Sequence, residues 1–115
     1  MTIDSPALNE SQAQARKSLV LLCRQMLSGE LSFFEGAIQV CALRFCVGVS
    51  EFDPDLLAFV GVASETDHLP PRQVQHHWSS AALQRLHPEF EQTEVWAKGF
   101  ASQACQNIIE RFSPK

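Results

Sequence analysis

Residues 31–45, which read LSFFEGAIQVCALRF, keep a clean helical period. The opening Ser32–Glu35 matches a capping box, in which the serine side chain and the glutamate three residues later each satisfy a free backbone amide. Apolar residues then recur at steps of three and four, as on one face of an amphipathic helix. These residues are Phe34, Ala37, Ile38, Cys41, Ala42 and Phe45. We expect Gly48 to end this helix.

The segment before it shows the same period. Asp4 or Ser5, followed by Pro6, is the predicted start of a first helix, and Gly29 is its predicted end. Its apolar stripe comprises Ala15, Leu19, Leu22, Cys23 and Met26. The connection of about three residues to the next helix favours antiparallel neighbours.

Asp53-Pro54 predicts the start of a third helix, because aspartate caps helices and proline fits their first position. Its continuation includes Phe59–Val62, where β-branched residues and a glycine also suit a short strand. A single strand would have no partner, so we expect a helix. A long loop follows at Ser64–Pro71, and then a short helix from Arg72 to about Trp78.

His87-Pro88 is predicted to break the chain between a helix capped by Ser79 and a last helix over residues 88–112. The apolar face of the last helix would comprise Phe90, Ala97, Phe100, Ala101, Ala104, Cys105, Ile108 and Phe112. The acids of its first turns, where the helix dipole favours anions, would be Glu89, Glu91 and Glu94. Together these segments predict a single all-α domain over residues 1–115, a compact bundle of roughly five or six helices with one irregular central loop.

Composition excludes several classes of protein. Hydrophobic residues make up 45% of the chain, enough for a core, so disorder is not expected. The 9 Lys and Arg against 13 Asp and Glu give a net charge of -4, which argues against binding of nucleic acid or anionic membrane. Residues 1–15 lack the cations and apolar run of a signal peptide, and the run Leu19–Cys23 is too short to span a membrane. We therefore expect a cytoplasmic protein.

The residue types that often carry catalysis form no recognised motif. Cys23, Cys41, Cys46 and Cys105 lack zinc-site spacing, and the cytoplasm would keep them reduced. All but Cys46 fall on predicted apolar faces, which favours core packing. The glycines are isolated, and no serine lies in a nucleophile elbow. We predict no catalytic residue and no cofactor, and an enzyme is the less favoured class.

Charge along the chain is uneven, because no lysine or arginine lies between Arg44 and Arg72. The acids in that interval flank the third helix at both ends. They are Glu51, Asp53, Asp55, Glu65 and Asp67. If folding brings them onto one edge, they form a docking surface for a basic protein. The predicted partner-binding set is completed by His68, His76, His77 and Trp78.

Each of these residues also has an ordinary structural interpretation. Acids near a helix start are favoured by capping and by the helix dipole, and a run of charge often lies on a solvated face. Trp78 and Trp96 suit packing at the edge of a core. The apolar residues Val40, Leu43 and Val47 leave self-association open as a third role.

An alternative function is a small metal- or ligand-binding site, with hydrolytic activity as one form of it. Carboxylate oxygens and imidazole nitrogens can hold a divalent ion. The residues that would form this site are Glu65, Asp67, His68, His76 and His77. Their spacing matches no metal motif, and the adjacent His76 and His77 would diverge by about 100° on a helix. We therefore predict no metal ligands in the favoured interpretation.

Three segments resemble small, uncharacterised bacterial proteins that are helical and acidic. The segments are residues 31–37 (LSFFEGA), 59–70 (FVGVASETDHLP) and 104–112 (ACQNIIERF), and the likeness spans about residues 18–112. This resemblance implies an immunity or regulatory partner and transfers no catalytic residue. The sequence thus favours a non-enzymatic binding module, such as an immunity or inhibitor protein that docks a basic toxin.

Overall fold

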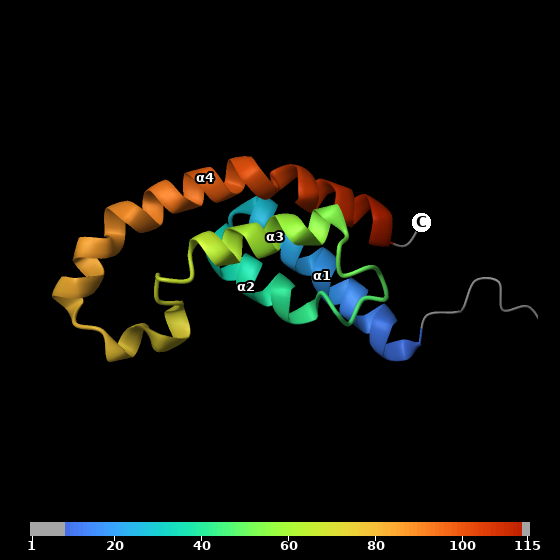
Figure 1. Cartoon of the computed structure of the whole chain (residues 1–115), viewed down its shortest axis with the longest axis horizontal. Coiled ribbons are helices and arrows are strands. Elements are labelled where there is room, and N and C mark those ends of the chain that lie inside the picture. Colours follow the sequence, from blue (N-terminus) through green and yellow to red (C-terminus); the bar gives the residue numbers. More distant parts are fainter. Residues whose placement is uncertain (1–8, 114–115) are drawn as a thin grey trace, which may run out of the picture.

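The computed structural model describes residues 9–113, which form helices and their connections (Figure 1). The elements are α1 (Glu10–Ser28), α2 (Phe33–Leu43), α3 (Pro54–Glu65), the 3-10 helix η1 (Arg72–His77) and α4 (Ser80–Phe112). The all-α prediction is confirmed, since no strand occurs within these residues and Phe59–Val62 is helical. In the same part of the chain, no helix combines the length and the apolar character needed to cross a bilayer.

Helix α1 begins with a capping box at Asn9, later in the chain than the predicted start. The side chain of Asn9 accepts a hydrogen bond from the backbone N–H of Gln12 at 2.7 Å. The side chain of Gln12 accepts one from the Asn9 backbone at 3.4 Å, which completes a capping box. The predicted start at Asp4 or Ser5, with Pro6, lies outside the described residues. The predicted end at Gly29 is confirmed by its φ of 88°, which glycine adopts without steric cost.

Helix α2 has its predicted cap at Ser32, whose side chain accepts from the backbone N–H of Glu35 at 3.0 Å. The return half of the capping box is absent, because the Glu35 carboxylate accepts from the backbone N–H of Arg72 instead. The helix ends at Leu43, earlier than the predicted stop at Gly48. Phe45 therefore leaves the helical stripe and is 65% exposed.

Glu94 of α4 supplies a second cap to α2. Its carboxylate accepts from the backbone N–H groups of Phe33 at 2.7 Å and of Phe34 at 3.3 Å. These are two of the amides that a helix start leaves without an internal partner. Phe34 also packs edge-on against Phe90 of α4, with ring centroids 5.5 Å apart. Both contacts fasten α2 to the middle of α4.

The predicted break at His87-Pro88 is wrong, because α4 runs without interruption from Ser80 to Phe112. Pro88 cannot donate the usual hydrogen bond to the carbonyl of Gln84. Both residues are exposed, so water can solvate that carbonyl and the helix continues with a curve that Figure 1 shows. Glu89, Glu91 and Glu94 consequently lie in the middle of a helix rather than in its first turns.

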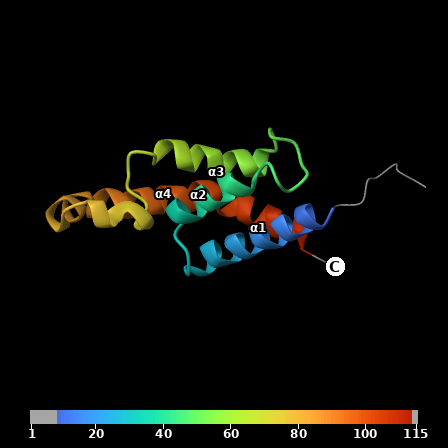
Figure 2. The same cartoon turned by 90° about the horizontal axis from the view of Figure 1, so that it is seen from below.

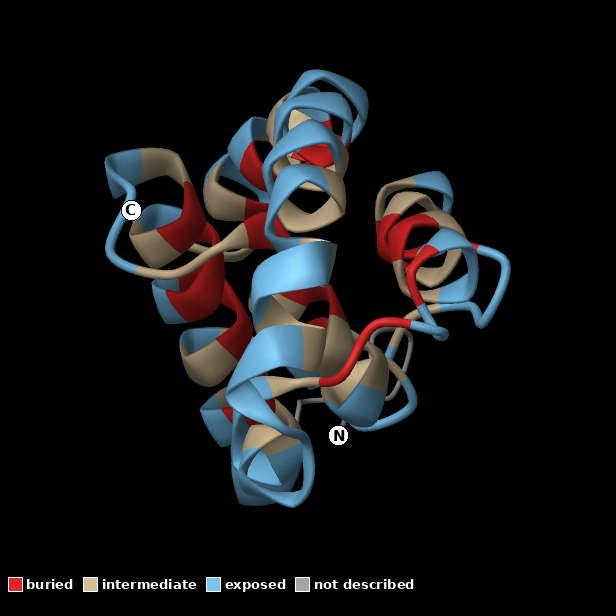
Figure 3. Cartoon of the chain, turned by 90° about the vertical axis from the view of Figure 1, so that its left-hand side faces the viewer, coloured by how far each residue is buried: buried red, intermediate tan, exposed pale blue. Residues whose placement is uncertain are grey.

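The core lies where α4 packs against α1, α2 and α3, and where α2 packs against α1 and α3 (Figures 1 and 2). Buried segments face one another across this arrangement, while exposed ones face outward (Figure 3). The largest fully enclosed side chains include Phe33, Phe59, Leu19, Met26, Leu56 and Ile108. Cys23 and Cys105 are 0% exposed, as predicted for core residues, and Cys41 is half-buried.

One part of the fold projects away from this core. Residues 71–96, which comprise η1 and the N-terminal half of α4, contain no buried residue. Figure 1 shows η1 and the first turns of α4 extending beyond the other helices, at the yellow end of the molecule. We refer to residues 71–92 as the arm.

Candidate partner-binding surface

Arg111 joins the C-terminal end of α4 to the start of α3. Its guanidinium donates to both carboxylate oxygens of Asp53, at 2.6 and 2.9 Å, and to Asp55 at 2.7 Å. Asn107 donates to the other oxygen of Asp55 at 2.9 Å. The hydrogen bonds from Arg111 hold the pKa of Asp53 below its ordinary value, although burial opposes this. These aspartates therefore have a structural role as an ion-paired clamp.

The predicted acidic edge is thus divided. Asp53 and Asp55 are paired with Arg111, and Glu51 precedes them as an exposed residue. Glu65 and Asp67 lie at the opposite end of α3. Since α3 has 12 residues, its ends are roughly 18 Å apart. The two groups of acids do not form one continuous surface.

Glu65 and Asp67 are exposed, and neither forms an ion pair with a residue that the structure describes. The residue between them, Thr66, is 2% exposed and donates from its hydroxyl to the carbonyl of Val62 at 2.8 Å. With Thr66 anchored inward, its two acidic neighbours remain at the surface. This end of α3 therefore presents carboxylates that stay available to an external cation.

A shallow pocket of about 210 Å³ lies beside these acids. It is lined by Glu65, Thr66, Gln92, Thr93 and Trp96. Trp96 is 41% exposed, so its ring is available at the pocket rim. The sequence pattern suggested core-edge packing for Trp96 and gave no indication that it lies next to Glu65.

Trp96 stacks on Phe100, with ring centroids 5.3 Å apart and an interplanar angle of 16°. Phe100 lies over Gly61 of α3, where an added Cβ would come within 3.3 Å of the phenylalanine ring. Phe100 is nevertheless 52% exposed, so its predicted place on the buried face is wrong. Val95 precedes Trp96 on α4, and Leu57 lies one turn before Gly61 on the same side of α3; both are exposed. We call these four residues the aromatic strip: Leu57, Val95, Trp96 and Phe100.

The predicted histidines lie elsewhere. His68 contacts Glu89 of α4, not Glu65 or Asp67. The rings of His76 and His77 lie close together at the end of η1, with centroids 3.9 Å apart and planes tilted by 43°. Both belong to the arm, as does Trp78, which is 41% exposed.

The geometry of the described residues does not favour a three-ligand metal site, nor thiol chemistry at Cys23 or Cys41. Within residues 9–113, no three side chains of His, Cys, Asp or Glu lie close enough together to hold a metal ion. The neighbouring thiol of Cys105, together with burial, raises the pKa of Cys23 far above its ordinary value. Burial also raises the pKa of Cys41. A thiol with a raised pKa stays protonated at neutral pH and is a weak nucleophile.

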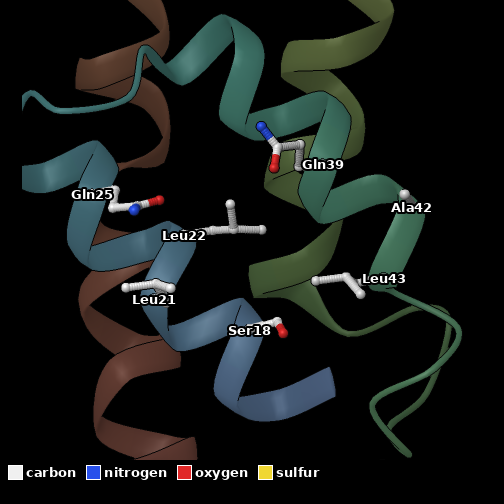
Figure 4. A pocket seen from close by; sticks show the side chains of 7 residues that line it. All are labelled: Ser18, Leu21, Leu22, Gln25, Gln39, Ala42 and Leu43. Carbon is white, nitrogen blue, oxygen red and sulfur yellow. The ribbon is translucent and has the colours of Figure 1, made fainter. Parts of the chain in front are cut away.

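A second concavity separates α1 from α2 (Figure 4). It has a volume of about 450 Å³ and no charged residue in its lining. The lining residues are Ser18, Leu21, Leu22, Gln25, Gln39, Ala42 and Leu43. Of the apolar residues that left self-association open, only Leu43 reaches this groove, because Val40 and Val47 are 0% exposed.

Comparison of the chain with protein-family models, with curated protein sequences and with solved structures found no match.

Proposed function

We propose that the chain is a non-enzymatic protein-binding module that docks a basic partner at Glu65 and Asp67. The observation that carries this proposal is the contrast between the two ends of α3. Asp53 and Asp55 are paired with Arg111, whereas Glu65 and Asp67 are exposed and form no ion pair with a described residue. An acidic surface of this kind steers a basic protein toward it and raises the association rate.

The neighbouring aromatic ring supports the same role. Tryptophan is enriched among the residues that dominate protein–protein binding energy, especially where surrounding contacts exclude water. Trp96 lines the pocket that Glu65 borders. Charge for steering and an apolar anchor for affinity therefore lie side by side. We further propose that the biological role is that of an immunity or inhibitor protein whose partner is a basic toxin.

The test begins with capture of binding proteins from the native lysate on immobilised chain, followed by kinetic measurement with the purified captured protein. We expect a basic partner that high salt releases, because screening weakens exposed charge pairs. The double substitution Glu65→Lys with Asp67→Lys should slow association about tenfold or more at low salt.

The matched control is Glu30→Lys with Glu110→Lys, which changes the net charge equally at exposed residues outside this end of α3. It should slow association much less. If the control and the test variant slow association equally, only the overall charge matters and the proposed surface is wrong. A partner that binds the test variant at an unchanged rate also contradicts the proposal.

A further inference from the structure

We infer that the partner contributes an amphipathic helix, which lies along the seam between α3 and α4 with its apolar face on the aromatic strip and a lysine or arginine at Glu65 and Asp67. This inference rests on the proposed function and adds the chemistry and geometry of the docking element. The exposed apolar side chains of the aromatic strip, which lie beside the acids, carry this inference.

The first observation is the width of the uncharged face on α4. Positions three and four apart on a helix lie on the same side, and the positions on this side include Gln92, Val95, Trp96, Gly99, Phe100 and Gln103. Val95 is 75% exposed. Gly99 has no atom within 4 Å of where a Cβ would be, so a second backbone can approach closely there. Exposed apolar side chains that gather in this way mark interaction sites.

The second observation is that charge differs between the two ends of the strip. At the α3 C-terminal end lie the exposed carboxylates of Glu65 and Asp67, and α4 has no lysine or arginine between Arg85 and Lys98. At the other end, Arg111 pairs with the aspartates at the start of α3. A docking element that is basic at one end and uncharged at the other complements this polarity.

The same polarity argues against a second copy of this chain as the occupant. In a two-fold pair, a parallel arrangement brings the acidic ends together. An antiparallel arrangement places each acidic end against the Arg111 clamp of the other copy, where one cation is already bonded to two aspartates and the net charge is negative. Neither of these two ends supplies a free cation to Glu65 and Asp67.

The distance between the strip and the acids along α3 sets the residue spacing that the partner helix needs. Leu57 and Glu65 are eight residues apart on α3, which corresponds to roughly 12 Å, or about two helical turns. A seam between two packed helices accommodates a third helix, whose apolar face fills the groove with side chains spaced at i, i+3, i+4 and i+7. The partner helix therefore needs apolar residues with this spacing and a lysine or arginine about two turns beyond the first of them.

The experiment uses a phage-displayed library of peptides of about 16 residues on a helix-stabilised scaffold, because shorter isolated helices are marginal in water. Selection on the full chain should enrich peptides with the stated apolar and basic spacing. Binding of an enriched peptide should weaken about 30-fold in Phe100→Ser, as for an interface hot spot, and about tenfold in the double variant Glu65→Lys with Asp67→Lys.

Two further variants serve as a control for the loss of an exposed phenylalanine and as a second test of the strip. Phe52→Ser removes another exposed phenylalanine, 71% exposed in the connection before α3, and should leave binding unchanged. Val95→Glu places a charge on the strip at a residue too exposed to disturb the core. It should reduce binding even if Phe100→Ser fails to fold, which a thermal melt followed by circular dichroism reveals.

The remaining outcomes overturn the inference. Peptides that depend on Glu65 and Asp67 but not on Phe100 or Val95 contradict the aromatic strip and leave the proposed function standing. Peptides that bind the strip without a basic residue contradict the charge requirement, and with it the proposed function. Absence of enriched peptides, or a dimer of the chain alone that Phe100→Ser dissociates, also contradicts a partner helix.

Discussion

Substitution of Arg111 by methionine tests whether the clamp stabilises the fold. Methionine retains an unbranched apolar stem, but it removes three charge-assisted hydrogen bonds of 2.6–2.9 Å to Asp53 and Asp55. Asp53 is 9% exposed, so the substitution leaves a largely buried carboxylate without its cation. Such a group is costly to keep ionised.

The expected loss in the free energy of unfolding is about 2 kcal/mol. A hydrogen bond to a charged group contributes about 1.5–3 kcal/mol, but bonds to one guanidinium do not add independently. The Arg111 side chain is 35% exposed, so solvent screening reduces its contribution. Asp53 also keeps the backbone N–H groups of Asp55 and Leu56 as donors. For a domain of this size, such a loss lowers the melting temperature by roughly 8 °C.

The assay is urea denaturation followed by circular dichroism at several pH values. Because the folded pKa of Asp53 is lowered, the stability it contributes is present above the ordinary aspartate pKa of about 3.9 and is lost as the pH falls through the folded value. The difference between wild type and Arg111→Met should therefore shrink below about pH 4. Arg111→Lys, which keeps the charge without the fork of donors, should lose about half as much. A loss below about 0.5 kcal/mol at pH 7, or an equal loss at pH 7 and at low pH, would refute the role of the clamp.

The structure also predicts how three further substitutions change the stability of the fold. Gly36→Ala should destabilise the protein by about 1–3 kcal/mol in a urea titration, because its Cβ would lie 2.2 Å from Sδ of Met26; an unchanged midpoint would show that Met26 repacks freely. Glu94→Ala removes the carboxylate cap of α2 and should cost about 1–2 kcal/mol, with Glu91→Ala as an exposed control that leaves the melting temperature within about 1 °C. Pro88→Ala restores a donor for the carbonyl of Gln84 and should increase helicity at 222 nm and raise the melting temperature; a decrease would mean that the curve of α4 is needed for packing.

Local signals predicted the helix boundaries that depend on neighbouring residues. Asp53-Pro54 caps α3 as predicted, and Gly29 ends α1, because these residues act within a single turn of backbone. Pro88 misled the prediction, since a helix can continue through a proline where it curves away from the ring and where water solvates the freed carbonyl. That condition depends on exposure, which the sequence does not state.

Contacts between distant residues could not be predicted in the same way. Arg111 and Asp53 are separated by 58 positions, so the spacing gave no indication that the acidic edge would be partly neutralised. Glu94 was interpreted as an acid of its own helix start, yet it caps α2 at a separation of 61 positions. Phe45 and Phe100 matched the helical period but are exposed. Periodicity identifies a stripe, whereas its buried width depends on which helices cover it.

The arm has a consequence for how the molecule opens. A segment without buried side chains can unfold locally at a small free-energy cost, while the helices around Phe59 and Ile108 stay intact. Amide hydrogen exchange should therefore be fastest in η1 beyond Arg72, whose amide is bonded to Glu35, and in the first turns of α4. It should slow sharply near Phe90 and Glu94, where α4 contacts α2. A protease at low concentration should cut the arm first. The boundary between the part that opens locally and the part that stays folded thus falls inside the single continuous helix α4, not between two helices.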